Sequence, residues 1–237
     1  MENVQSKITK EAFEWVAMAT AGDDRPILGY VNTMQVDGGY ALVGADGFRC
    51  HVMHFTDEPS VLGLMPTANT RTYHLDKKQF PDYRVIDPKP EDVVLSFDIY
   101  GPSFMMDLDT FRHTKELWLE VRDGALYMAD GFNDIESVHV TRCLLDNVTG
   151  DPCGRLVRRK YLKQVLNTPF EPQHVTVSFS LNRAVSGTSN GPIKLDFHNG
   201  YFGLVMPMFK QDTSENSRII DSVARIFEPV NMLGETA

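Results

Sequence analysis

Three dipeptides of the Asx-Gly type constrain this sequence more than any other feature. Each one stands between two runs that are rich in β-branched and aromatic residues. Asx-Gly supplies the positive φ angles of a type I′ turn, and such flanking runs are typical of paired strands. The three turns are Asp37-Gly38, Asp123-Gly124 and Asn199-Gly200. The sequence therefore predicts a chain built mostly from antiparallel β-hairpins.

Further strands and a few helices are expected from the spacing of the apolar residues. The additional strands are predicted at residues 70–75, 93–100, 137–142 and 174–180. Helices are predicted at residues 10–20, with Thr9 as the N-cap, at 154–167 and at 217–227, with a short turn of helix in 107–114. A few helices among many antiparallel strands indicate an α+β fold.

Charge and cysteine content narrow the class of protein. A net charge of −9 argues against a chain that coats nucleic acid indiscriminately, although it leaves room for one local basic surface. Cys50, Cys143 and Cys153 are too scattered for a disulfide framework or a zinc site, and a reducing cytoplasm is the simplest setting. We find no apolar run of membrane-spanning length and no secretory leader. We therefore expect a cytoplasmic protein that does not enter a membrane.

An enzyme is the alternative from another class. His51 and His54 lack a carboxylate-histidine set with metal spacing. Asp107 and Asp109 lie near His113, but neither a nucleophile elbow nor a phosphate-binding loop accompanies them. We therefore expect a protein without catalysis, metal or cofactor.

A short motif occurs twice. Ala-Asp-Gly-Phe follows a predicted hairpin at residues 45–48 and again at residues 129–132. One supersecondary unit used more than once is the natural interpretation. Between the two copies, Pro88 and Pro90 interrupt the strands among mixed charges, which indicates a domain boundary.

Three separated segments carry a family resemblance. The first runs from Arg-Pro-Ile-Leu at residues 25–28 to Ala-Asp-Gly-Phe-Arg at 45–49, and the second is Phe-Pro-Asp-Tyr-Arg-Val-Ile at 80–86. The third joins residues 160–162 and 165–166 with Gly-Leu-Val-Met-Pro-Met at 203–208. In this order they resemble the middle domain, the interdomain segment and the last helix and strand of the bacterial DNA polymerase sliding clamp, or β clamp. The resemblance implies DNA-clamp domains at residues 1–86 and 87–209, with a helical extension at 210–237.

In that family these segments build a hydrophobic groove where polymerases and repair proteins dock short peptides. The resemblance therefore implies a processivity factor that tethers partner proteins to DNA. Flexible, polarizable methionines suit such a groove, whereas the alternative is that they are simply core. Phe48 stands where the family often has His, and Cys50 where it has Leu, so partner preference is expected to differ. Carried onto this chain, the groove residues are Ala45, Gly47, Phe48, Arg49, Cys50, Pro81, Val85, Leu204, Val205, Met206 and Met208.

A cluster of cations in the predicted helix at 154–167 indicates where DNA would lie. Arg155, Arg159 and Lys163 fall at i, i+4 and i+8, with Arg158 beside them. The resemblance implies that this helix contacts the phosphates of double-stranded DNA without sequence preference. Lys7 and Lys10 would be secondary contributors. The alternative is an ordinary solvated helix face.

The chain is shorter than a three-domain β clamp, and the family's first domain has no counterpart. Two small domains per chain would suit a ring of three chains, a homotrimer placed on DNA by a clamp loader. The alternative is a clamp-derived binding module that keeps the groove and does not encircle DNA. The extension at 210–237 would either cover the groove or cap a sheet edge.

Overall fold

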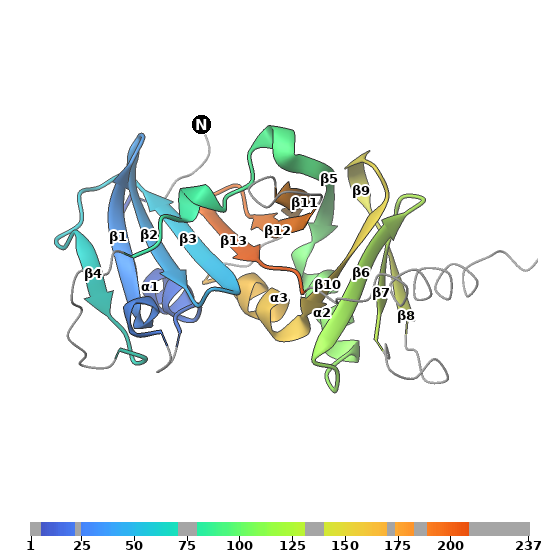
Figure 1. Ribbon diagram of the computed structural model, residues 1–237, viewed down its shortest axis with the longest axis horizontal. Helices are drawn as coiled ribbons and strands as arrows, with labels where there is room; N and C mark the ends of the chain where they lie inside the picture. Colours follow the sequence, from blue (N-terminus) through green and yellow to red (C-terminus); the bar gives the residue numbers. More distant parts are fainter. Residues whose placement is uncertain are drawn as a thin grey trace, which may run out of the picture.

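A large antiparallel sheet is the main feature of the computed structural model, which describes residues 6–21, 25–70, 80–130, 140–169, 174–182 and 189–208 (Figure 1). Every neighbouring pair of strands in it is antiparallel. In spatial order the strands are β4 (Gly63–Pro66), β1 (Tyr30–Val36), β2 (Gly39–Ala45), β3 (Arg49–Phe55), β13 (Tyr201–Val205), β12 (Ser189–Asp196), β11 (His174–Asn182), β5 (Val93–Tyr100) and β9 (Asp146–Gly150).

A smaller antiparallel sheet packs beside the second half of the large one (Figure 1). Its strands, in spatial order, are β10 (Cys153–Arg158), β6 (Glu116–Arg122), β7 (Ala125–Ala129) and β8 (Val140–Leu144). Together the two sheets confirm the predicted α+β class with mostly antiparallel strands.

The three predicted hairpins are confirmed. Asp37-Gly38 joins β1 to β2, Asp123-Gly124 joins β6 to β7, and Asn199-Gly200 lies in the connection from β12 to β13. Asp123 and Gly124 have φ angles of 49° and 70°, the two positive values that a type I′ turn requires. In the other two connections the positive φ angles fall elsewhere: at Gly38 and Gly39 between β1 and β2, and at His198 and Gly200 between β12 and β13.

The two halves of the large sheet meet where β13 pairs with β3. Their register runs from Tyr201 opposite Met53 to Val205 opposite Arg49. Because β3 precedes the predicted boundary near residue 87 and β13 follows it, one sheet continues across that boundary. The division into two domains stays a prediction.

In the described part of the chain, three α-helices lie on one side of this sheet (Figure 1). Helix α1 (Lys10–Ala17) packs on β2 and β3, α3 (Arg159–Leu166) on β13 and β10, and α2 (Gly101–Thr110) against β5 and α3. Thr9 Oγ1 accepts from the Ala12 N–H at 3.2 Å, which confirms the predicted N-cap. None of the described helices is long and apolar enough to span a bilayer.

Side chains on the helical face of the sheet form the main core, which continues into the smaller sheet. Trp15, Phe55, Phe97, Phe111 and Phe179 are all almost completely buried there. Burying large aromatic side chains supplies much of the apolar area that stabilises such a core.

A second, smaller core lies on the opposite face of the sheet, where β3 meets β13. Residues 80–92 cross this face (Figure 1). Tyr83 packs there against Phe202 and His54, and the His54 Nε2 lies 2.9 Å from the Tyr83 hydroxyl. Short 3₁₀ segments occur at η1 (Pro26–Gly29), η2 (Tyr83–Val85) and η3 (Pro90–Asp92).

The predicted helix at 154–167 is wrong in its first part. Residues 153–158 form strand β10, which pairs with β6 from Cys153 opposite Val121 to Arg158 opposite Glu116. Gly154 lies against Trp118, where a Cβ would come within 2.3 Å of the indole, so the strand depends on a partner distant in sequence. The helix begins only at Arg159.

Other predicted elements differ less. The turn of helix expected in 107–114 belongs to α2, which begins earlier, at Gly101. The strand expected at 137–142 is seen as β8, from Val140, with residues 131–139 outside the described part. The predicted strand at 70–75, apart from Thr70, and the predicted helix at 217–227 also lie outside the described residues.

Candidate functional site: an apolar groove beside α3

An apolar groove of about 230 Å³ opens beside helix α3. Three elements form it: the β2–β3 turn, the start of α3 and the segment that follows β13. The side chains that line it are Phe48, Arg158, Tyr161, Met206, Pro207 and Met208. Three of these, Phe48, Met206 and Met208, belong to the groove predicted from the sequence.

The main chain fixes the position of the groove walls. The Met206 N–H donates to the Phe48 carbonyl at 2.8 Å, and the Met208 N–H donates to the Leu156 carbonyl at 2.7 Å. Residues 206–208 are therefore held between the β2–β3 turn and β10. Phe48 is 45% exposed, and its ring stacks against that of Tyr161 at an interplanar angle of 15°.

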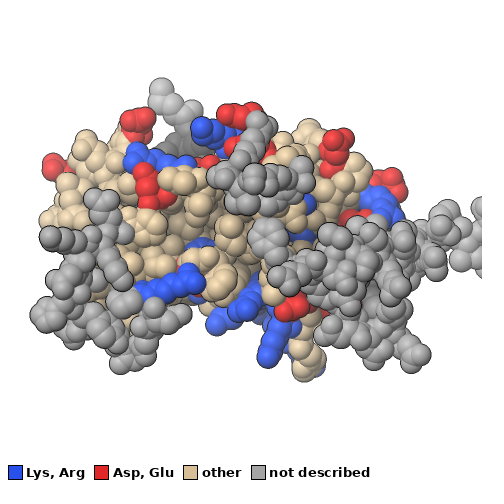
Figure 2. Space-filling model, viewed as in Figure 1, with Lys and Arg blue, Asp and Glu red and all other residues tan. Residues whose placement is uncertain are grey.

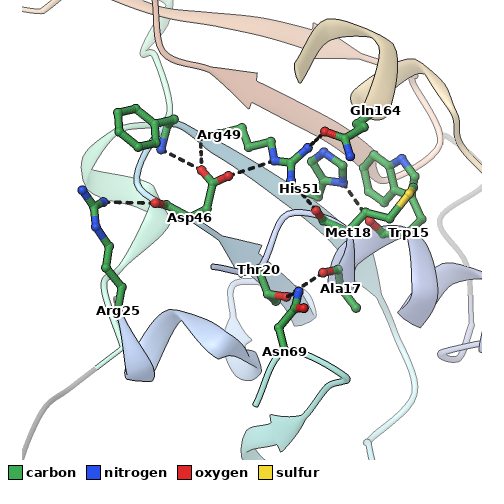
Figure 3. Close-up of polar contacts among 11 residues, drawn as sticks. Trp15, Ala17, Met18, Thr20, Arg25, Asp46, Arg49, His51, Asn69 and Gln164 are labelled. Atoms are coloured by element: carbon green, nitrogen blue, oxygen red, sulfur yellow. Dashed lines mark hydrogen bonds and ion pairs between the residues drawn. The ribbon is translucent and has the colours of Figure 1, made fainter. Parts of the chain in front are cut away.

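The turn that presents Phe48 is closed by Asp46. Its Oδ1 accepts from the N–H groups of Phe48 and Arg49 at 2.8 and 3.0 Å, and Gly47 adopts a φ of +86°. A Cβ at Gly47 would lie 1.8 Å from Nη1 of Arg25, whose guanidinium donates to the Asp46 carbonyl (Figure 3). Glycine is therefore required at residue 47 for two reasons: the positive φ angle, and the Arg25 side chain that occupies the space a Cβ would need.

Arg49 supports the groove from beneath. Its guanidinium pairs with Asp46 and donates to the Met18 carbonyl and to Gln164 Oε1 (Figure 3). It also lies 4.9 Å from the Tyr161 ring centroid. Burial lowers the pKa of Arg49, and the Asp46 carboxylate opposes that shift. Arg49 is thus a structural brace that connects the turn to α1 and α3.

The other predicted groove residues fall into two groups. Ala45, Cys50, Leu204 and Val205 are buried in the cores, and burial raises the pKa of the Cys50 thiol. Pro81 and Val85 are exposed on the segment between β4 and β5, and they do not line this groove. For these six residues a peptide contact stays a prediction.

Sequence reasoning missed three of the lining residues. Tyr161 and Pro207 lie inside the segments that carried the family resemblance, so the signal was present. Arg158 was assigned to a DNA-facing helix because β10 was mistaken for helical sequence.

The predicted cationic face does not exist as one surface. Arg155 lies in β10, is 4% exposed, donates to the Ser180 carbonyl at 3.2 Å and has its guanidinium 5.5 Å from the Phe179 centroid. Burial lowers its pKa. A strand alternates its side chains, so Arg155 cannot share a helical stripe with Arg159 and Lys163. The DNA-facing assignment of Arg155 is therefore wrong.

The remaining predicted cations have protein partners or lie elsewhere. Arg159 donates to the carbonyls of Leu108, Arg112 and Thr114, and Lys163 pairs with Asp109. Lys10 pairs with Glu14 at 3.7 Å, and Lys7 lines a separate cavity beside β4. Arg158 and Lys160 remain exposed at the start of α3, and Figure 2 shows basic side chains gathered around this helix.

Solved structures with this arrangement of strands and helices are bacterial clamps. The Streptococcus pneumoniae DNA polymerase III beta chain matches 85% of this chain with a TM-score of 0.68 and 17% identity. The Bacillus subtilis DNA polymerase sliding clamp matches 85% of it with a TM-score of 0.68 and 15% identity. The fold is that of the bacterial sliding clamp. The predicted resemblance is confirmed at this level.

The clamp fold here is shorter than in its relatives. The chain spans 62% of the length of each of these two clamps. A Helicobacter pylori beta clamp, described as bound to a DNA ligase peptide, matches 88% of this chain with a TM-score of 0.66 and 12% identity. No protein-family model and no curated protein sequence matches the chain.

Proposed function

We propose that this chain is a clamp-type platform that docks an apolar segment of a partner protein in the groove beside α3. The observation that carries the proposal is the arrangement of Phe48, Met206 and Met208 around one opening, held by main-chain hydrogen bonds to two different elements. The peptide-bound state of a clamp from Helicobacter pylori supports it by analogy of fold. The role of the chain is therefore binding, with no catalytic step.

The chemistry of the groove suits short apolar anchors. Its volume of about 230 Å³ accommodates one or two side chains, less than a typical small-molecule pocket of roughly 300–1,000 Å³. Methionine side chains have three rotatable bonds and a polarizable sulfur, so they adapt to more than one anchor. Aromatic rings at Phe48 and Tyr161 add flat contact surfaces.

The proposal extends to tethering on double-stranded DNA. The three helices share one side of the sheet, and the exposed cations Arg158 and Lys160 lie at the start of α3. Such cations attract phosphates without sequence preference. Strands β4 and β9 are the edges of the large sheet within the described residues, and pairing of such edges between chains would close a homotrimeric ring for a clamp loader to place on DNA.

A binding module that does not encircle DNA is the second candidate. The observation that favours it is the pairing of helix cations within the chain: Lys163 with Asp109 and Lys10 with Glu14. These pairs reduce the positive charge that the helical side presents to phosphates.

Two measurements separate the candidates. Light scattering gives the oligomeric state, and retention on nicked circular DNA is compared with retention on the same DNA after linearisation. A clamp forms a trimer, stays on the circle and slides off linear DNA. A module stays monomeric, and its retention is the same on circular and on linear DNA. Phe48→Ser should abolish binding of the partner peptide whether the chain is a clamp or a binding module. Unchanged peptide binding would refute the groove as the docking site.

A further inference from the structure

Arg158 brings a guanidinium charge to the apolar groove. Its guanidinium lies 5.7 Å from the ring centroid of Phe48 and 5.9 Å from that of Tyr161. No carboxylate in the described part of the chain forms an ion pair with it. Arg25 lies near the same Phe48 ring, at 5.2 Å, and its guanidinium donates to the Asp46 carbonyl at 3.0 Å.

Two acidic side chains on adjoining elements, Asp46 and Asp109, already have partners. Asp46 accepts two main-chain N–H groups through Oδ1 and the Arg49 guanidinium through Oδ2. Asp109, on α2, pairs with Lys163 and lies 3.8 Å from Arg159. Glu116 stands opposite Arg158 in the pairing of β6 with β10, but none of the ion pairs among the described residues joins the two. Arg158 therefore brings its charge to the rim of the groove without an ion-pair partner there, on a chain whose total is −9.

We propose that the groove selects a partner peptide in which a carboxylate side chain flanks the apolar anchor, and that Arg158 pairs with this carboxylate. The inference rests on the proposed function and specifies the partner of the same groove. A guanidinium presents a planar fork that matches a carboxylate in two parallel hydrogen bonds. A DNA backbone has the negative charge but offers no apolar side chain for the groove, whereas an acidic peptide offers both.

The position of Arg158 beside two aromatic rings strengthens the pairing. The rings hold the guanidinium in place, which reduces the rotamer entropy lost on binding. An exposed ion pair contributes little, and a pair against an apolar wall contributes more because water screens it less. We therefore expect an acidic peptide to bind about five- to tenfold more tightly than its neutral counterpart.

Three fluorescein-labelled peptides, acetylated and amidated, test this on the full-length chain by fluorescence anisotropy. They are Gly-Glu-Leu-Phe-Glu-Gly, the neutral Gly-Gln-Leu-Phe-Gln-Gly and the anchorless Gly-Glu-Ala-Ala-Glu-Gly. The acidic Leu-Phe peptide should bind most tightly, the neutral one less tightly, and the anchorless one least. The preference for the acidic peptide should shrink at about 1 M salt, where the screening length is about 3 Å.

Arg158→Gln is the decisive variant, and Lys160→Gln is its matched control. Both remove one exposed cation from the start of α3, but only Arg158 lines the groove. Arg158→Gln should reduce the acidic-to-neutral preference to about one. The ratio of the two affinities is the readout, because Arg158 also lines the groove and its loss is expected to weaken both peptides. Lys160→Gln should keep the preference.

Each contrary outcome has a distinct meaning. Equal affinities for the acidic and neutral Leu-Phe peptides, with the anchorless one still excluded, overturn the carboxylate pairing and leave the groove function standing. Equal losses in the two variants overturn it in favour of general charge attraction. Failure of all three peptides with both the wild type and the double variant Ile226→Ser, Phe227→Ser overturns both proposals. Binding only by the full-length double variant Ile226→Ser, Phe227→Ser would assign the groove to the chain's own extension and overturn the partner peptide.

Discussion

Arg49 Nε donates to Asp46 Oδ2 over 3.1 Å, in an ion pair that is almost withdrawn from solvent. The side chains are 6% and 13% exposed. Because the same guanidinium also donates to the Met18 carbonyl and to Gln164, one side chain ties the turn that presents Phe48 to two helices. Loss of this arginine should therefore affect stability and the groove together.

Arg49→Met is expected to destabilise the chain by about 3–5 kcal/mol, because removing one partner of a buried pair leaves the other charge uncompensated. Urea unfolding followed by circular dichroism measures the change. Arg84→Met is the matched control, because Arg84 pairs with Asp82 at 2.6 Å on the surface. That variant should unfold almost as the wild type does. A loss at Arg49 no larger than that at Arg84 would show that the buried pair is dispensable.

His51 makes the stability of the fold depend on pH. Its ring is fully buried and stacked on Trp15 at 4.4 Å, and Nδ1 lies 2.8 Å from the Trp15 carbonyl. Since a carbonyl can only accept, Nδ1 carries the proton, and Nε2 has no hydrogen-bond partner within the described part of the chain. Burial lowers the pKa of His51 to about 3.

The neutral form of His51 is therefore the folded form, and protonation favours unfolding. Its contribution is complete above the ordinary histidine pKa of about 6.5 and is lost as the pH falls toward the folded value. Between pH 7 and pH 5 the free energy of unfolding should fall by about 2 kcal/mol from this group. His51→Leu should flatten that part of the pH profile, whereas His113→Leu, at an exposed histidine, should keep the wild-type slope. Identical slopes in all three proteins would contradict the assignment.

The sequence alone predicts elements whose structure depends on neighbouring residues. It fails for elements whose structure depends on a partner distant in the chain. Asp123-Gly124 and Thr9 report their own turn and cap, so the hairpins and α1 could be found without a structure. Residues 153–158 contain apolar and basic residues that fit a helix as well as a strand. Only the pairing with β6, more than thirty residues earlier in the chain, makes them β10.

The groove shows the same division. Phe48, Met206 and Met208 were predicted because their motifs resemble a known family, not because spacing placed them together. Which of the neighbouring residues point into the groove depends on the pleat of β13: Leu204 and Val205 face opposite cores, and the chain opens to the groove only after the strand ends. A linear motif does not contain that information.

Arg159 is expected to act in folding and not in DNA contact. Its guanidinium donates to the Leu108, Arg112 and Thr114 carbonyls at 3.2, 3.2 and 3.3 Å, at and beyond the end of α2. Arg159→Lys keeps the charge but loses the fork, so about 1–3 kcal/mol of stability should be lost as these carbonyls lose a partner. Thermal unfolding measures the loss. A stable Arg159→Lys variant with weakened DNA retention would contradict this assignment and restore the phosphate role.

Two glycines allow helices to lie close to the large sheet. One glycine faces a side chain of its helix, and the other faces the main chain of its helix. A Cβ at Gly203 on β13 would lie 2.3 Å from Cγ1 of Val165 on α3. A Cβ at Gly44 on β2 would lie 2.2 Å from the main-chain oxygen of Val16 on α1. The first clash involves a side chain that can be truncated, whereas the second involves backbone that cannot.

A pair of double-mutant cycles should therefore give opposite results. Gly203→Ala alone should cost about 1–3 kcal/mol by overpacking, and Val165→Ala should restore part of that loss, giving a coupling of at least about 1 kcal/mol. Gly44→Ala should be harmful as well, but Val16→Ala should not rescue it, because the Val16 carbonyl oxygen remains in place. Urea unfolding of the four single and two double variants measures both cycles. Rescue at Gly44, or strict additivity at Gly203, would mean that the helices shift on the sheet instead of being fixed by these contacts.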